Sequence, residues 1–278
     1  MPIATIDIVV NIDYYTNLYF SNGEDAPYKL RDKTTIYLKP ILVKNYPIYL
    51  GCIDILQIPK NDSSDIKIIQ MSYLQYLIEV LFKQDDSKEK INESKLRMVL
   101  SCCLGADYVG FVKNEKNKWV IAICDNEGTI EHIINASEFD EIRELILNQN
   151  DAHYDNRYVN PDVRQVMEEY YRIKYADVHP PSLEKKKAFV SSKLGKTFKE
   201  LGEMNVREFE LVYKACADSE IYLANKVTEA SYKYEVKNPS QHPLYQPEKD
   251  AYAEMFSDTS VLNGKGLQGA ENIGVGLQ

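Results

Sequence analysis

The sequence has no apolar run of membrane-spanning length. A stretch such as Trp119–Cys124 is far shorter than the roughly 20 apolar residues that a helix needs to cross a bilayer. Residues 1–10 carry Asp7 and no basic side chain, so we expect no secretory signal peptide. We therefore expect no membrane partner and a location in the cytoplasm.

The sequence also lacks a disulfide framework. Its five cysteines are an odd number, and Cys102 and Cys103 are adjacent, an arrangement that seldom supports a structural bridge. We therefore interpret the cysteines as reduced thiols, which is typical of cytosolic proteins.

Basic residues are outnumbered. The chain has 33 Lys and Arg against 42 Asp and Glu, for a net charge of -9, which argues against a general nucleic-acid-binding protein. Its 278 residues, 44% hydrophobic and 27% charged, are typical of one large or two medium globular domains with a proper core. The 21 tyrosines indicate either a sticky aromatic surface or the codon bias of an AT-rich genome, and we prefer the second interpretation.

The helix with the clearest sequence signals is predicted over residues 134–150. It separates two parts of the chain that have different secondary-structure patterns. Asn135 is a suitable N-cap, and Glu138 stands at the N3 position of a capping box; Ser137 is a competing N-cap. Four residues at helical spacing form an apolar stripe: Phe139, Ile142, Leu145 and Ile146. Before this helix the pattern mixes strands and helices, and after it only helices are predicted.

The N-terminal half is predicted to contain a small, mostly antiparallel sheet with helices. A turn is expected between Asn22 and Pro27, and a hairpin turn over 114–117. Strands are predicted over 3–11, 34–38, 108–113, 119–124 and 129–134, and helices over 41–58, 72–81 and 92–104. The polar segment between residues 84 and 90 is expected to link two helices.

The C-terminal half is predicted to be all helical. Four helices are expected, beginning at Asn160–Pro161, Leu183, Thr197 and Asn205. The last would run from 205 to 234, about 44 Å, unless the acidic patch from Asp218 to Glu220 divides it in two. A proline-containing connector over 239–247 and a short helix over 249–256 would follow.

These patterns predict an α+β fold with two domains and a tail. We expect an α+β domain over 1–150, a helical domain over 151–256 and a flexible tail over 257–278, which is rich in Gly, Ser, Asn and Gln.

No motif of catalysis or cofactor binding survives inspection. Gly195-Lys196-Thr197 is like the end of a phosphate-binding loop, but Val190 stands where its first glycine should be, and a predicted helix precedes it instead of a strand. Asp151, His153 and Asp155 alternate in a polar loop without the spacing of a known metal site. We therefore expect no cofactor and no metal.

Three further candidates have simpler interpretations as ordinary structure. His132 lies in a predicted strand, and no local signature pairs Cys103 or Cys216 with a histidine as nucleophile and base. The most basic region resembles a helix-turn-helix, but its lysines are typical of a solvated helix surface: Lys185, Lys186, Lys187, Lys193, Lys196 and Lys199. We expect no nucleic-acid partner and no catalytic residue.

Several segments, taken in order, resemble the tail or baseplate assembly chaperones of tailed bacteriophages. These are LKPILVKNYPIYLGCIDIL and IIQMSYLQYLIEVLF, then ASEFDEIRELILNQN, VNPDVRQVMEEYY and the stretch from REFELVYKACADSEIYLANKV to HPLY. The resemblance spans most of residues 38–245 and implies a non-enzymatic protein of the host cytoplasm. Such a protein would hold an aggregation-prone tail component, of the tape-measure or hub type, until assembly.

The apolar stripe of the 205–234 helix is the predicted partner-binding surface, because a long helix needs a neighbour to cover its stripe. The candidate residues are Phe209, Val212, Tyr213, Leu223, Val227 and Tyr234. The alternatives are a structural component of the virion, at the baseplate or neck, then a nucleic-acid-binding protein and a Cys–His enzyme. A homo-oligomer stays open.

Overall fold

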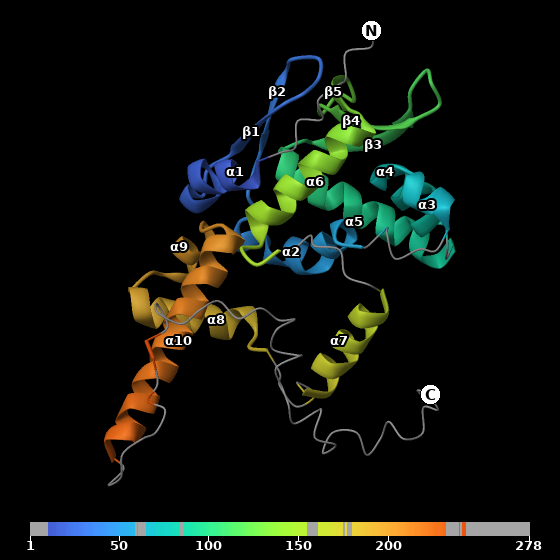
Figure 1. The fold of residues 1–278 in the computed structure, drawn as a ribbon. Coiled ribbons are helices and arrows are strands. Elements are labelled where there is room, and N and C mark those ends of the chain that lie inside the picture. The colour runs from blue at the N-terminus through green and yellow to red at the C-terminus, as the bar shows by residue number, and fades with distance from the viewer. Residues whose placement is uncertain are drawn as a thin grey trace, which may run out of the picture. The chain divides into compact units, whose positions relative to one another are not determined.

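The structure is a computed structural model that describes residues 11–58, 60, 65–83, 86–154, 161–174, 176, 180–231, 239 and 241–242 (Figure 1). The α-helices are α1 Ile12–Leu18, α2 Tyr46–Cys52, α3 Ile66–Gln70, α4 Tyr73–Tyr76, α5 Asp86–Leu104, α6 Ala136–Asn150, α7 Pro161–Lys174, α8 Leu183–Leu194, α9 Phe198–Gly202 and α10 Val206–Ser231. Shorter helical turns are η1 Phe20–Asn22, η2 Val43–Asn45, η3 Ile53–Leu56 and η4 Leu77–Leu81. The strands are β1 Ala26–Lys29, β2 Thr35–Leu38, β3 Tyr108–Lys113, β4 Trp119–Cys124 and β5 Ile130–Ile134.

The strands form two small antiparallel sheets, which confirms the predicted α+β class. β1 pairs with β2, and the second sheet has the order β3-β4-β5. In that sheet Tyr108 lies opposite Cys124 and Lys113 opposite Trp119, so the hairpin has the predicted strands. Asn117 has a positive φ of 56° in its turn, a conformation that asparagine tolerates better than most residues.

Helix α6 begins as its sequence predicts. The Asn135 side chain accepts from the N–H groups of Ser137 and Glu138, while the Glu138 carboxylate accepts from the Asn135 N–H at 2.8 Å. Ile134 and Phe139, on either side of the cap, are both fully buried. The helix contacts α1, α4 and β4, and it crosses the middle of the first half of the chain in Figure 1.

Hydrogen bonds join the C-terminal end of α6 to the end of β2 and to the residues that follow it. Gln149 Nε2 donates to the Leu38 carbonyl at 2.9 Å, and the Ile41 N–H donates to Asn150 Oδ1 at 2.7 Å. Both amide side chains are buried, so these bonds replace the water that Gln149 Nε2 and Asn150 Oδ1 lose on folding.

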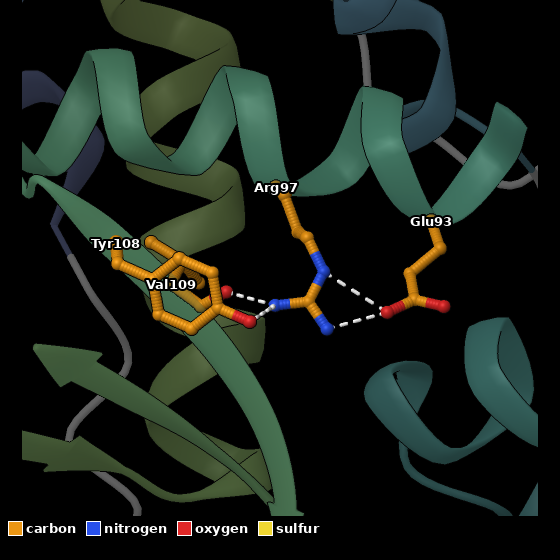
Figure 2. Close-up of polar contacts among 4 residues, drawn as sticks. All are labelled: Glu93, Arg97, Tyr108 and Val109. Carbon is orange, nitrogen blue, oxygen red and sulfur yellow. Dashed lines mark hydrogen bonds and ion pairs between the residues drawn. The ribbon is translucent and has the colours of Figure 1, made fainter. Parts of the chain in front are cut away.

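Helix α5 is clamped to β3 by Arg97 (Figure 2). Its guanidinium bonds Glu93 one turn earlier on α5, the Tyr108 hydroxyl at 3.2 Å and the Val109 carbonyl. It also lies over the Phe111 ring, 4.8 Å from the centroid. Both polar and cation–π contacts therefore position the helix against the first strand of the sheet.

A second, smaller core fastens helices from late in the sequence to the N-terminal half. Its members are Val43, Val190, Leu201, Met204 and Phe209. Backbone bonds reinforce it, because the Val43 N–H donates to the Met204 carbonyl and the Val206 N–H to the Ile41 carbonyl, both at 2.8 Å.

The chain divides into two compact units that do not follow the expected boundary at residue 150. The first unit is Met1–Asn160 with Pro180–Cys216, and the second is Pro161–His179 with Ala217–Gln278. The small core explains the difference, since it packs α8, α9 and the first turns of α10 onto η2, which comes from residues 43–45.

Several predicted boundaries need correction. The turn predicted over 22–27 is present at Gly23, whose φ is 70°, but the last two residues of this segment begin β1, a strand that was not predicted. Asn11, expected at the end of a strand, is the N-cap of α1. Helix α5 begins at Asp86 because the predicted link has no helix-breaking residue. Residues 43–56 are helical as predicted, with tighter turns at both ends. Strand residues 3–10, the 160 cap, most of the 239–247 connector, the 249–256 helix and the tail over 257–278 lie outside the described residues.

Helix α10 runs without interruption from Val206 to Ser231, about 39 Å. The Asn205 side chain accepts from the Glu208 N–H at 2.7 Å, as the predicted N-cap requires. The acidic residues Asp218 and Glu220 do not divide the helix.

Candidate functional site

The predicted partner-binding stripe of α10 meets two different environments. Phe209 is fully buried in the small core, with Val212 and Tyr213 packed against it. Leu223 and Val227 instead expose 55% and 72% of their surface. Tyr234 lies outside the described residues. Among the described candidate positions, therefore, only those after Cys216 are exposed and available to a partner.

Among the residues of the second unit whose burial the structure describes, none has a buried side chain. Helix α7 exposes Val166 and Ile173 at 60% and 68%, and α10 exposes Ile221 at 60% as well. Apolar surface of this kind on a described helix marks a candidate protein-binding site.

A cleft of about 300 Å³ is the second candidate, and it lies within the first unit. Its walls come from α2, the end of α6 and the turn after it, α8 and the first turns of α10. The lining residues are Tyr46, Tyr49, Asn150, Asp151, Ala152, His153, Lys186, Arg207, Glu210 and Leu211.

One side of the cleft is a closed polar cluster. Lys186 Nζ lies 2.8 Å from both carboxylate oxygens of Glu210, and the Tyr46 hydroxyl donates to the same carboxylate at 2.5 Å. Lys186 also lies over the Tyr213 ring, 5.1 Å from its centroid. Burial, the Glu210 hydrogen bond and the Glu210 charge raise the pKa of Tyr46, so its hydroxyl keeps its proton.

The other side of the cleft holds Arg207. Its Nη1 donates to the carbonyls of Asn148 and Asp151, the second at 3.4 Å. Burial lowers the pKa of Arg207, and the charge of Asp151 opposes that effect. No sequence motif predicts this cleft. Among its lining residues, Asp151 and His153 stand out in the sequence only as possible metal ligands, and Lys186 only as part of a basic helix.

The structure does not assemble the other chemical candidates into a site. Asp151 Oδ1 accepts from the His153 N–H at 2.8 Å, as in an ordinary turn, and Asp155 lies outside the described residues. Within the described residues, no group of three or more His, Cys, Asp or Glu side chains is placed to hold a metal ion. Gly195 caps the C-terminus of α8 with a φ of 67°, so no strand precedes Gly195-Lys196-Thr197.

Three of the cysteine thiols are held in their unreactive form. Burial raises the pKa of Cys52, Cys102 and Cys103, which favours the unreactive thiol. His132 lies in β5, near Asp32, whose pKa is lowered mainly by hydrogen bonds from Thr34. Of the lysines of α8, Lys186 does not belong to a solvent-facing patch, since it points into the cleft and pairs with Glu210.

Comparison of the chain with protein-family models, curated proteins and solved structures gave no match. No described helix combines the length and hydropathy that a membrane span requires.

Proposed function

We propose that this chain is a non-enzymatic protein of tailed-phage assembly, which binds a tail or baseplate morphogenesis protein through apolar side chains exposed on α10. The partner is of the tape-measure or hub type, and binding takes place in the host cytoplasm before the particle is complete. The phage context rests on the sequence resemblance described above.

The observation that carries the binding role is the exposure of Leu223 and Val227. They are four residues apart on one helix, so their side chains lie on the same side of α10. Fully burying an aliphatic side chain of this size contributes roughly 1.5–3 kcal/mol, so a partner that covers both gains substantial binding energy.

Helix α7 offers a second pair with the same property. Val166 and Ile173 are seven residues apart, which also places them on one helix face. Each helix by itself thus has the pattern used in helix-on-helix and helix-in-groove recognition.

Charged side chains near Leu223 and Val227 would keep this part of the protein soluble until a partner covers the two apolar side chains. Lys226 and Glu229 form an ion pair at 2.8 Å on the same helix, next in sequence to Val227. The whole chain is acidic, with a net charge of -9, which keeps free copies apart.

Co-expression with the tape-measure and hub proteins of the same phage tests the proposal. The wild-type chain should keep one of them soluble and co-purify with it. Leu223→Glu and Val227→Glu should each reduce the co-purified amount at least tenfold, because a buried carboxylate is costly. The matched control is Asn225→Glu, which adds the same charge at an exposed position between them.

Equal co-purification by all three variants would contradict the proposed surface. Mass spectrometry of purified virions then separates the two assembly roles. A chaperone is absent from the finished particle, whereas a structural component of the baseplate or neck is present at a fixed stoichiometry.

A further inference from the structure

We propose that the cleft of the first unit binds a carboxylate group, held by Arg207 of α10 and the hydroxyl of Tyr49 of α2. The carboxylate belongs either to a free amino acid or to the C-terminal end of a polypeptide. This inference is independent of the proposed function, because the cleft and the exposed pair on α10 share no residue.

Arg207 supplies the positive charge and the unused donors. The protein anchors the guanidinium through Nη1, on two backbone carbonyls, which fixes its direction without neutralising it. Within the described part of the chain, Nε and Nη2 have no hydrogen-bond partner. A half-buried guanidinium of this kind is stabilised by an anion that fits its planar fork.

Tyr49 supplies a second unused donor on the same cleft. Its hydroxyl forms no hydrogen bond with the described residues, although the ring is largely buried against Tyr46, with the two ring centroids 5.6 Å apart. Burial, followed by the charges of Asp151 and Glu210, raises the pKa of Tyr49 to about 12. The hydroxyl therefore carries its proton at neutral pH and is available to donate.

The remaining charges of the cleft explain why one carboxylate fits better than a phosphate. Lys186 and Glu210 satisfy each other, so they add no net charge. The Asp151 carboxylate lines the same cleft and attracts Arg207 without joining it in an ion pair. A dianionic phosphate would be repelled by Asp151 more strongly than a monoanionic carboxylate, while the ammonium group of an amino acid would be attracted.

Binding to the full-length chain can be measured by NMR through the Arg207 Nε–H signal. The probes are alanine, acetyl-tetra-alanine with a free carboxyl, the same peptide as its amide, and inorganic phosphate. We expect either alanine or the peptide acid to shift the Arg207 signal with a Kd on the order of 1 mM. The amide should not bind, and which of the two carboxylates binds more tightly identifies the source of the ligand.

Variants locate the site. Arg207→Gln should weaken binding of the carboxylate probe by roughly tenfold or more, and Tyr49→Phe should weaken it by roughly threefold. Each substitution removes a hydrogen-bond donor to a charged group. The probe's binding to the variants is followed calorimetrically. Lys199→Gln removes one positive charge from an exposed position of α9 and should have no effect. Tyr49→Phe breaks no described hydrogen bond within the protein, so it decides the question even if Arg207→Gln lowers stability.

Four results would overturn the proposal. They are equal binding of the peptide acid and its amide, tighter binding of phosphate than of either carboxylate, no shift with any probe up to about ten times that Kd, and unchanged affinity in Tyr49→Phe. Arg207→Gln and Tyr49→Phe should leave the co-purification of the tail protein unchanged, so failure here is distinguishable from failure of the proposed function.

Discussion

The two compact units differ in how far they bury their apolar side chains. The first unit buries a continuous set of them around α6, with residues such as Phe139, Ile142 and Leu145 fully inaccessible. Among the second unit's residues whose burial the structure describes, every apolar side chain is at least partly exposed. The first unit therefore buries an apolar core of its own, whereas the helices of the second carry apolar surface that burial would stabilise.

The same difference in burial is found within helix α10, because its first turns belong to the first unit and its later turns to the second. Phe209 near its start is fully buried, and Val227 near its end is 72% exposed. Both positions belong to the same apolar stripe in the sequence. The spacing of a stripe identifies the face of a helix, but it does not say whether the chain itself covers that face.

The largest effect is expected from Phe209→Ala. The substitution leaves a cavity among Val43, Val190, Leu201 and Met204, and it should lower the free energy of unfolding by roughly 3–5 kcal/mol. Urea unfolding followed by the fluorescence of Trp119, the single tryptophan, measures this in the first unit. A loss below about 1 kcal/mol would mean that α10 is not anchored there.

Acid should destabilise the first unit partly through Glu79. Hydrogen bonds from Gln75 and from the Trp119 indole at 2.7 Å lower the pKa of Glu79 below its ordinary 4.5. Because the folded-state pKa is the lower one, the stabilisation is present above pH 4.5 and is lost as the pH falls through the folded-state pKa.

Glu79→Gln tests this pH dependence. The variant should be less stable than the wild type at neutral pH, and the difference should shrink as the pH falls toward 3, as measured by urea midpoints. Glu127→Gln, at an exposed loop position, is the matched control and should follow the wild type. A constant difference at every pH would contradict the role of the carboxylate.

The smallest effect is expected from Val227→Ala. Because the side chain is exposed, the free energy of unfolding should change by less than about 0.5 kcal/mol, and any change should be a gain from the higher helix propensity of alanine. Thermal unfolding followed by circular dichroism measures it. A loss of about 2 kcal/mol would show that Val227 is packed in the free chain, and would remove the contrast with Phe209.

Features fixed by neighbouring residues were predictable from the sequence. The capping boxes at Asn135 and Thr197 and the hairpin of β3 and β4 each depend on residues a few positions apart. The short β1 was missed because its partner and a nearby turn, and not its own composition, determine it.

Features made by distant residues were not predictable. The unit boundary depends on contacts between residues near 43 and residues near 204, and the cleft brings Tyr49, Lys186 and Arg207 together from three separate helices. No local pattern encodes such contacts. Of the predicted binding residues, Leu223 and Val227 are exposed, while Phe209 belongs to a core that periodicity alone could not distinguish from an open face.

Hydrogen exchange of the full-length chain, alone and with its co-purified tail protein, tests the central claim most directly. The account predicts that peptides from residues 217–231 gain protection in the complex, while peptides from 206–214, already packed on the first unit, do not change. Protection gained only in 206–214, or none in 217–231, would contradict the claim that the exposed half of α10 is the binding surface.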